Sequence, residues 1–229
     1  EGIEYLKKEI ERLVKSNLPF IRENIHNHLE KELKEYFWNI IHERKNIFRA
    51  DEEDFSLGYL MLRKFGHSLS KEKIAEILGD YTLTSEKAHP MQFYIYPTDT
   101  NQEFECGEII KSKENNEFFV ILTPSCDFIE TSKRKRKAER ILLVQASSLN
   151  TREEYIKYKT KASNTNKNEL EKLINSSKGD RYFFLPKTPF IEENRVVDFQ
   201  NKEMVSYESL SEPKNYERIA KLDSPFAES

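Results

Sequence analysis

The sequence has few of the residues that mark several common protein classes. Two cysteines, Cys106 and Cys126, are too few for a disulfide framework, which favours a reducing, cytoplasmic setting. Six glycines in 229 residues leave little material for a glycine-rich phosphate loop. No apolar run approaches the roughly 20 residues of a membrane span, and no signal-peptide pattern opens the chain. We therefore predict no membrane association.

Histidine is also scarce, and its spacing does not suit a metal site. The two cysteines form no Cys-x2-Cys pattern, and the five histidines form no His-x3-His pattern. His26 and His28 fall on different sides of a helix. We predict no metal and no cofactor. The net charge of −3 argues against a uniform affinity for nucleic acid. The first residue is Glu1 rather than Met, which favours a fragment or a processed chain.

The first eighty residues show the apolar spacing of α-helices. Steps of three and four predict a helical subdomain over 1–80, with Ser70 as an N-cap and Gly79 just past a helix end. The predicted helices span 2–15, 20–48, 55–65 and 71–78. The apolar stripe of the helix over 20–48 fits either a bundle core or a dimer seam, so a homodimer through the N-terminal helices stays open.

After a boundary over 80–90 the pattern changes to short β-like runs. A domain over 91–229 is predicted to hold strands at 91–96, 108–111, 117–123, 141–146, 181–185, 195–199 and 204–207. Short helices are predicted at 151–158 and 169–174, a closing helical turn at 216–222, and a mobile stretch at 160–168. The fold class is α+β: an N-terminal helical subdomain followed by a small, mostly antiparallel β-barrel with helical insertions.

The most apolar strand ends in a polar corner. Pro124 stops the run that begins at Phe118, because proline cannot donate to a ladder. The corner carries Ser125, Cys126 and Asp127. A carboxylate beside a thiol disfavours the thiolate that would act as a nucleophile, so we interpret the three residues as a structural corner. Asp127 is predicted to accept backbone N–H groups in an Asx-type turn.

The most cationic segment lies between this corner and the next strand. Over 131–140, six bases face the single acid Glu139, a local charge of +5. Cations crowded on one loop gain from releasing counterions from a phosphate backbone, although many charge runs are only solvated loops. Aromatic candidates for base stacking are Phe128, Tyr155, Tyr158 and Tyr182. The predicted nucleic-acid-binding residues are Lys133, Arg134, Lys135, Arg136, Lys137 and Arg140.

Several short motifs carry a resemblance to a known family. The opening Gly107-Glu108-Ile109, the strand and corner over 120–127, the strand over 141–146 and the closing segment 218–223 resemble the SH3-like barrel of PemK/MazF-type toxins. The resemblance covers about 91–222 and implies an SH3/PemK-like barrel with endoribonuclease activity. Where those toxins carry an Arg before the central strand, this sequence has Asn115, Asn116 and Glu117, and a carboxylate repels phosphate. The corner over 122–127 also resembles uncharacterised output regions that follow receiver domains in bacterial response regulators.

These observations predict a regulatory or output module rather than an enzyme. It would be cytoplasmic, belong to a bacterial signalling or defence system, and contact nucleic acid, a receiver domain or another protein through 133–140. One alternative is a PemK/MazF-like endoribonuclease in which Arg134, Lys135 or Arg136 replaces the missing Arg and Thr123 or Ser125 lies near the phosphate. A third is a protein–protein adaptor that uses the region of Trp38.

Overall fold

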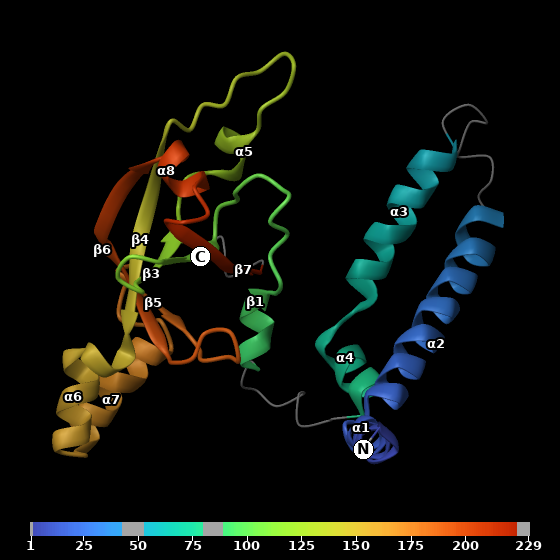
Figure 1. Cartoon of the computed structure of the whole chain (residues 1–229), viewed down its shortest axis with the longest axis horizontal. Coiled ribbons are helices and arrows are strands. Elements are labelled where there is room, and N and C mark those ends of the chain that lie inside the picture. Colours follow the sequence, from blue (N-terminus) through green and yellow to red (C-terminus); the bar gives the residue numbers. More distant parts are fainter. Residues whose placement is uncertain (1, 43–52, 80–88, 224–229) are drawn as a thin grey trace. The chain divides into compact units, whose positions relative to one another are not determined.

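The chain divides into two compact units, which we describe separately. The computed structural model describes residues 2–42, 53–79 and 89–223, and the units are Glu1–Ala88 and His89–Ser229 (Figure 1). The described part of the first unit is helical, and the second holds a curled antiparallel sheet. This confirms the predicted combination of N-terminal helices and antiparallel strands. None of the described helices is both long and apolar enough to cross a membrane.

The N-terminal unit is built around the helix α2. The described elements are α1 (Gly2–Lys15), α2 (Leu18–Tyr36), the π-helical segment η1 (Phe37–His42), α3 (Glu53–Ser68) and α4 (Lys71–Leu78). The Asn24 side-chain amide donates to the carbonyl of Ile77 at 2.9 Å, which ties α2 to α4. His28 is only 6% exposed and lies 3.4 Å from the Ser68 hydroxyl at the end of α3. Few other described side chains of this unit are buried, so its core is small.

The ends of α4 follow the sequence prediction closely, whereas the long helix does not. Ser70 accepts the N–H of Lys73 at 3.2 Å, and Gly79 adopts a left-handed φ of 67° at the C-cap. The helix predicted over 20–48 begins earlier, at Leu18, and becomes π-helical at Phe37. Its residues 43–48 lie outside the described residues, as does most of the predicted boundary over 80–90.

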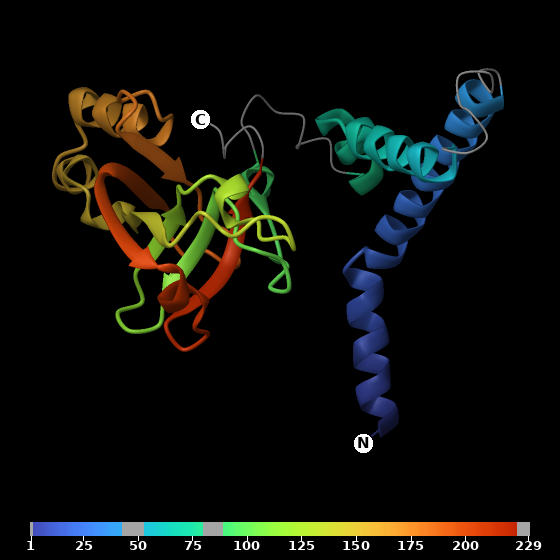
Figure 2. The same ribbon diagram turned by 90° about the horizontal axis from the view of Figure 1, so that it is seen from above.

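The β unit is one seven-stranded antiparallel sheet with the order β1-β7-β2-β3-β4-β6-β5. Neighbouring strands pair antiparallel, and the register shifts in two ladders, opposite Ile109–Ile110 in the β2–β7 pair and opposite Val144–Ala146 in the β4–β6 pair, where the extra residues form bulges in β7 and β6. Bulges increase local twist, which suits a sheet that curls (Figure 2). The strands are β1 (Tyr94–Ile95), β2 (Glu108–Ser112), β3 (Phe118–Ile121), β4 (Arg140–Ser148), β5 (Tyr182–Leu185), β6 (Arg195–Ser206) and β7 (Tyr216–Leu222).

The curled sheet is closed by side chains rather than by a strand ladder. Tyr94 on the edge strand β1 donates its hydroxyl to the carbonyl of Pro186, just after the opposite edge strand β5, at 2.8 Å. Beside it, the rings of Tyr96 and Phe190 stack at 4.2 Å. Burial raises the pKa of the Tyr94 phenol, so this donor keeps its proton throughout the physiological range. The sheet is therefore a half-barrel whose two edges are joined by aromatic contacts.

The central strand β3 is buried on both faces. Phe118 and Val120 point into the interior cluster of the half-barrel, whereas Phe119 and Ile121 point into a second cluster on the other face. All four side chains are at most 6% exposed. This explains why the sequence shows an uninterrupted apolar run here instead of the alternation of a half-exposed strand. The second cluster is covered by loop and helix residues that include Phe104, Phe128, Ala138 and Leu210.

Two helices between β4 and β5 form the main insertion, and they correct one prediction. They are α6 (Glu153–Thr160) and α7 (Asn164–Ile174), and Leu170 and Leu173 of α7 pack in a third apolar cluster. The stretch 160–168 was predicted to be mobile because it lacks apolar anchors. Instead, Ser163 accepts the N–H of Asn166 at 3.3 Å and caps α7, which begins at Asn164.

Three further predictions for the β unit, two of strands and one of a helical turn, are also wrong in detail. Residues Pro90–Phe93 form a short 3-10 helix, because His89 and Gln92 build a capping box around Pro90, and only Tyr94–Ile95 pair as β1. The strands predicted at 195–199 and 204–207 are a single strand, β6, that ends at Ser206. Residues Tyr216–Leu222 were predicted to be helical and are the strand β7, which pairs with both β1 and β2.

Candidate functional site

The corner after β3 is a single helical turn held from both sides. The strand β3 ends at Ile121, and Pro124 directly precedes α5 (Ser125–Phe128). Phe128 is fully buried and anchors the turn in the second apolar cluster. The Ser125 hydroxyl accepts the N–H of Cys106 at 2.9 Å, which ties the corner to the segment before β2. This hydrogen bond engages the Ser125 hydroxyl within the fold, and the structural role of the corner stays a prediction.

The described contacts of Cys126 and Asp127 include one with each other and several with the basic segment. The exposed thiol of Cys126 lies 3.8 Å from the Asp127 carboxylate, and the backbone carbonyl of Asp127 accepts the N–H groups of Lys137 and Ala138 at 3.1 and 3.0 Å. The predicted Asx turn is thus replaced by main-chain bonds to the basic segment. Burial raises the pKa of the other thiol, Cys106, which disfavours its thiolate form.

The basic segment, residues 133–140 (the basic loop), alternates between inward and outward side chains. Figure 1 shows the chain between α5 and β4 extending beyond the sheet. Arg134, Arg136 and Ala138 are half-buried or buried, whereas Lys133, Lys135 and Lys137 are exposed. Ala138 belongs to the second apolar cluster, so the inner face of the loop is attached to the fold. The sequence shows one run of cations, but the structure divides it into two sets.

The two inner arginines hold the loop in place. Arg134 donates to the carbonyl of Cys126 at 2.6 Å. The guanidinium of Arg136 lies 3.4 Å above the ring of Tyr207 and donates to Glu130 at 3.0 Å. Tyr207, at the start of α8 (Tyr207–Ser211), in turn donates its hydroxyl to Glu103 at 2.9 Å. These contacts engage one terminal nitrogen of each guanidinium group, and both Nε atoms are buried. We therefore interpret the two arginines as residues that order the loop.

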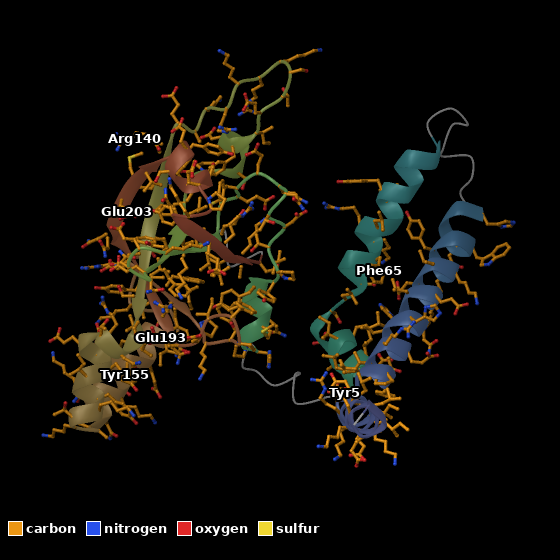
Figure 3. All side chains as sticks on the ribbon, viewed as in Figure 1. Tyr5, Phe65, Arg140, Tyr155, Glu193 and Glu203 are labelled. Carbon is orange, nitrogen blue, oxygen red and sulfur yellow. The ribbon has the colours of Figure 1, made fainter. Side chains whose placement is uncertain are left out.

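The outer cations are free of such contacts. Lys133, Lys135, Lys137 and Arg140 are exposed, and none forms an ion pair with a described residue. Arg140 begins β4 at the base of the loop (Figure 3). The three lysines and Arg140 therefore present four positive charges from a backbone that other residues hold fixed. This is the concentration of unpaired charge that a polyanion would recognise.

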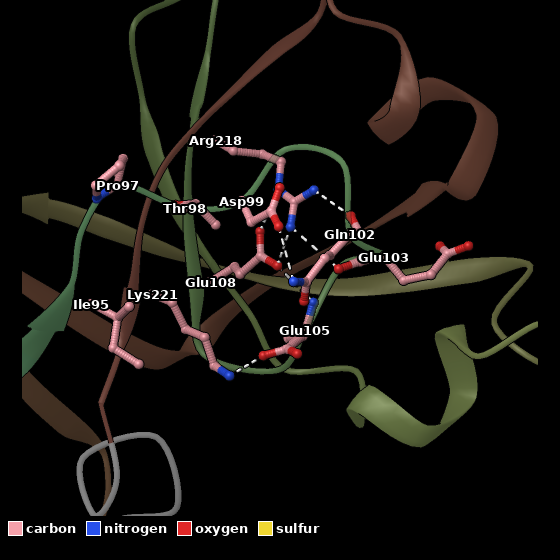
Figure 4. Close-up of a pocket in the computed structure, with 10 residues that line it drawn as sticks. All are labelled: Ile95, Pro97, Thr98, Asp99, Gln102, Glu103, Glu105, Glu108, Arg218 and Lys221. Atoms are coloured by element: carbon pink, nitrogen blue, oxygen red, sulfur yellow. Dashed lines mark hydrogen bonds and ion pairs between the residues drawn. The ribbon is translucent and has the colours of Figure 1, made fainter. Parts of the chain in front are cut away.

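A pocket of about 240 Å³ is lined by residues that include Glu103, Glu108 and Arg218 (Figure 4). At its centre, Arg218 donates two bonds to Glu108, at 2.7 and 2.6 Å, and further bonds to the carbonyls of Gln102 and Glu103. Glu108 is 1% exposed, and its burial raises its pKa despite the bonds from Arg218. Lys221 pairs with Glu105. Two of the pocket's carboxylates, Glu105 and Glu108, are thus paired with its two cations, which indicates a structural role for these four residues.

The groups proposed for a ribonuclease site are occupied by the fold. The Thr123 hydroxyl is buried and accepts the N–H of Leu142 at 2.8 Å, and Ser125 is bound to Cys106. Before β3, the Asn115 amide donates to Glu117 at 2.7 Å, so this turn presents a carboxylate. None of these contacts leaves a free hydroxyl beside a free arginine.

The aromatic candidates for base stacking either lie away from the basic loop or are covered by other side chains. Phe128 is fully buried, which removes it as a stacking surface. Tyr155, Tyr158 and Tyr182 pack against the third apolar cluster beside α6 and α7, and Figure 3 labels Tyr155 there. The guanidinium of Arg152 covers Tyr182 at 4.5 Å. The aromatic side chain that does meet the loop is Tyr207, which sequence reasoning missed because its role depends on a contact with Arg136 across seventy residues.

Comparisons of the chain with protein-family models, with curated proteins and with solved structures found no match. Among the described residues, no group of three or more His, Cys, Asp and Glu side chains gathers as a metal site would require. Any proposal for the function therefore rests on the geometry of the basic loop.

Proposed function

We propose that the β unit is a non-enzymatic binding module that contacts the phosphate backbone of nucleic acid through the outer cations of the basic loop. The observation that supports this proposal is the division of the loop into anchoring arginines and free lysines. Because Arg134 and Arg136 hold the loop in place, its backbone loses little conformational freedom on binding. The entropy cost of ordering the loop is therefore small, which favours affinity. The module would serve regulation, as an output domain does.

The charge of the whole chain limits the strength and range of this interaction. With a net charge of −3, attraction is confined to the neighbourhood of the loop and is screened within about 8 Å at physiological salt. Lysines bind phosphate as point charges and read no base edge, and the part of the chain that the structure describes offers no free aromatic side chain beside them. We therefore expect binding without sequence preference, with modest affinity and strong salt dependence.

The test is titration of the full chain into labelled single- and double-stranded RNA and DNA, followed by anisotropy. The variant Lys133→Gln/Lys135→Gln/Lys137→Gln should bind much more weakly than the parent chain. A control with the same charge change is Lys161→Gln/Lys187→Gln/Lys202→Gln, because these lysines are exposed and form no ion pair with a described residue. The control should bind as the parent does. Equal loss in both variants would show that only net charge matters and would refute the loop as the site.

The same samples run on a denaturing gel distinguish a binding module from a ribonuclease. The proposal expects intact strands, because Thr123 and Ser125 are engaged by backbone N–H groups. Shortened strands that persist in the triple lysine variant would indicate a hydrolytic site elsewhere on the chain.

A further inference from the structure

The first helix carries an apolar stripe that the described residues of its own unit leave uncovered. Ile3, Leu6, Ile10 and Leu13 of α1 are 46–74% exposed, and no residue of α1 is buried. Asn17, with a left-handed φ of 58°, separates α1 from α2, so the stripe does not continue into the bundle formed by α2, α3 and α4. Within the N-terminal unit, Figure 2 shows α1 diverging from those helices. Such a stripe requires a partner outside its own unit.

The spacing of the stripe identifies the kind of partner. Steps of three, four and three place the four residues at alternating a and d positions of two heptads, the repeat of a coiled-coil seam. Both a positions, Ile3 and Ile10, are isoleucine, and both d positions, Leu6 and Leu13, are leucine. β-Branched residues at a with leucine at d favour a parallel two-stranded coil. We propose that α1 pairs with α1 of a second copy of this chain as a parallel coiled coil.

The charges that flank the seam favour the same orientation. Lys7 occupies an e position and Glu9 a g position. In an antiparallel pair with Ile3 opposite Leu13 of the second copy, Lys7 would lie near Lys7 and Glu9 near Glu9, so both flanks would repel. In a parallel pair, Glu9 faces Val14 and Lys7 faces Gly2, and no like charges meet. Flanking charges set orientation in coiled coils, so the antiparallel arrangement is excluded on both sides.

The remaining charges of α1 suit a solvated outer face. Arg12 pairs with Glu9 at 2.9 Å along the helix, and Tyr5 is exposed at a c position, away from the seam. Two heptads make a short coil, so we expect a dimer that dissociates on dilution. This inference is independent of the basic loop, which lies in the other unit.

Sedimentation velocity of the full chain across the micromolar range tests the pairing. We expect a concentration-dependent dimer, and Leu6→Glu should raise its dissociation constant at least about tenfold, because each dimer would then bury two unpaired carboxylates. The matched control is Tyr5→Glu, which makes the same charge change one residue away, off the seam, and should leave the constant unchanged. Circular dichroism checks that both variants stay folded, as expected for side chains exposed in one copy.

Three outcomes would overturn the proposal: a monomer at every concentration, equal weakening by both variants, or a dimer that Leu6→Glu leaves intact. Orientation is tested with Ile3→Cys in a Cys106→Ser/Cys126→Ser background. Parallel pairing brings the two new cysteines together, so mild oxidation should yield a covalent dimer, whereas antiparallel pairing places them at opposite ends of the coil. A dimer that does not cross-link would refute the parallel arrangement.

Discussion

Removing Arg218 should destabilise the β unit more than any exposed substitution. Its guanidinium donates two bonds to Glu108 and two more to the carbonyls of Gln102 and Glu103. With the Arg218 side chain 11% and the Glu108 side chain 1% exposed, Arg218→Met would leave a carboxylate buried without its counter-ion. Breaking one side of such a pair costs about 3–5 kcal/mol of unfolding free energy. Replacing both partners removes the unpaired charge, so Glu108→Gln/Arg218→Met should recover at least about 2 kcal/mol of that loss.

Urea unfolding followed by the near-ultraviolet circular dichroism of tyrosine provides the assay, because the single tryptophan, Trp38, reports on the other unit. The cost of Arg218→Met should also depend on pH. Without Arg218, burial alone raises the pKa of Glu108, so the folded variant retains the proton and gains stability as the pH falls toward about 4. A loss of unfolding free energy below about 1 kcal/mol, or a double variant no more stable than the single one, would refute the description of this pair as a buried, stabilising ion pair.

Three further substitutions, the first with a matched control, test other parts of the structure. Arg136→Ala should destabilise the β unit by about 1–2 kcal/mol through loss of its ring and carboxylate partners, whereas Lys135→Ala should stay within about 0.5 kcal/mol in the same urea assay. Arg181 lowers the pKa of Asp198, so this pairing adds to the free energy of unfolding above an ordinary aspartate pKa of about 4. That stabilisation is lost as the pH falls through the lowered pKa, and the cost of Asp198→Asn should therefore vanish in acid titrations of unfolding. Ser70→Ala should lower the stability of the N-terminal unit by about 1 kcal/mol, followed by tryptophan fluorescence.

The sequence predicted the elements whose conformation depends on residues close together in the chain. The caps of α4 need only Ser70 and Gly79, and the strand β3 needs only its own apolar run. The strand β7 was missed because Glu217, Arg218 and Lys221 are good helix formers, and its conformation is decided by pairing with β1 and β2, more than a hundred residues away. Tertiary pairing overrode propensity there.

The candidate site shows the same limit. Composition located the basic loop, because charge counts need no structure. It did not reveal which cations are free, since that depends on the positions of Tyr207, Glu103 and the carbonyl of Cys126. The loop does alternate Lys and Arg from Lys133 to Lys137, and this period of two, with arginine inside and lysine outside, is the one sequence signal that anticipates the division.

The salt dependence of nucleic-acid binding tests the central claim most directly. Four free cations on single strands predict that log Kd changes with log salt with a slope of about 3 in magnitude. Lys133→Gln/Lys135→Gln/Lys137→Gln should reduce that magnitude by about 2, and Lys161→Gln/Lys187→Gln/Lys202→Gln should leave it unchanged. A slope unaffected by the first variant, or no binding by the parent chain at low salt, would contradict the assignment of the basic loop as a nucleic-acid contact.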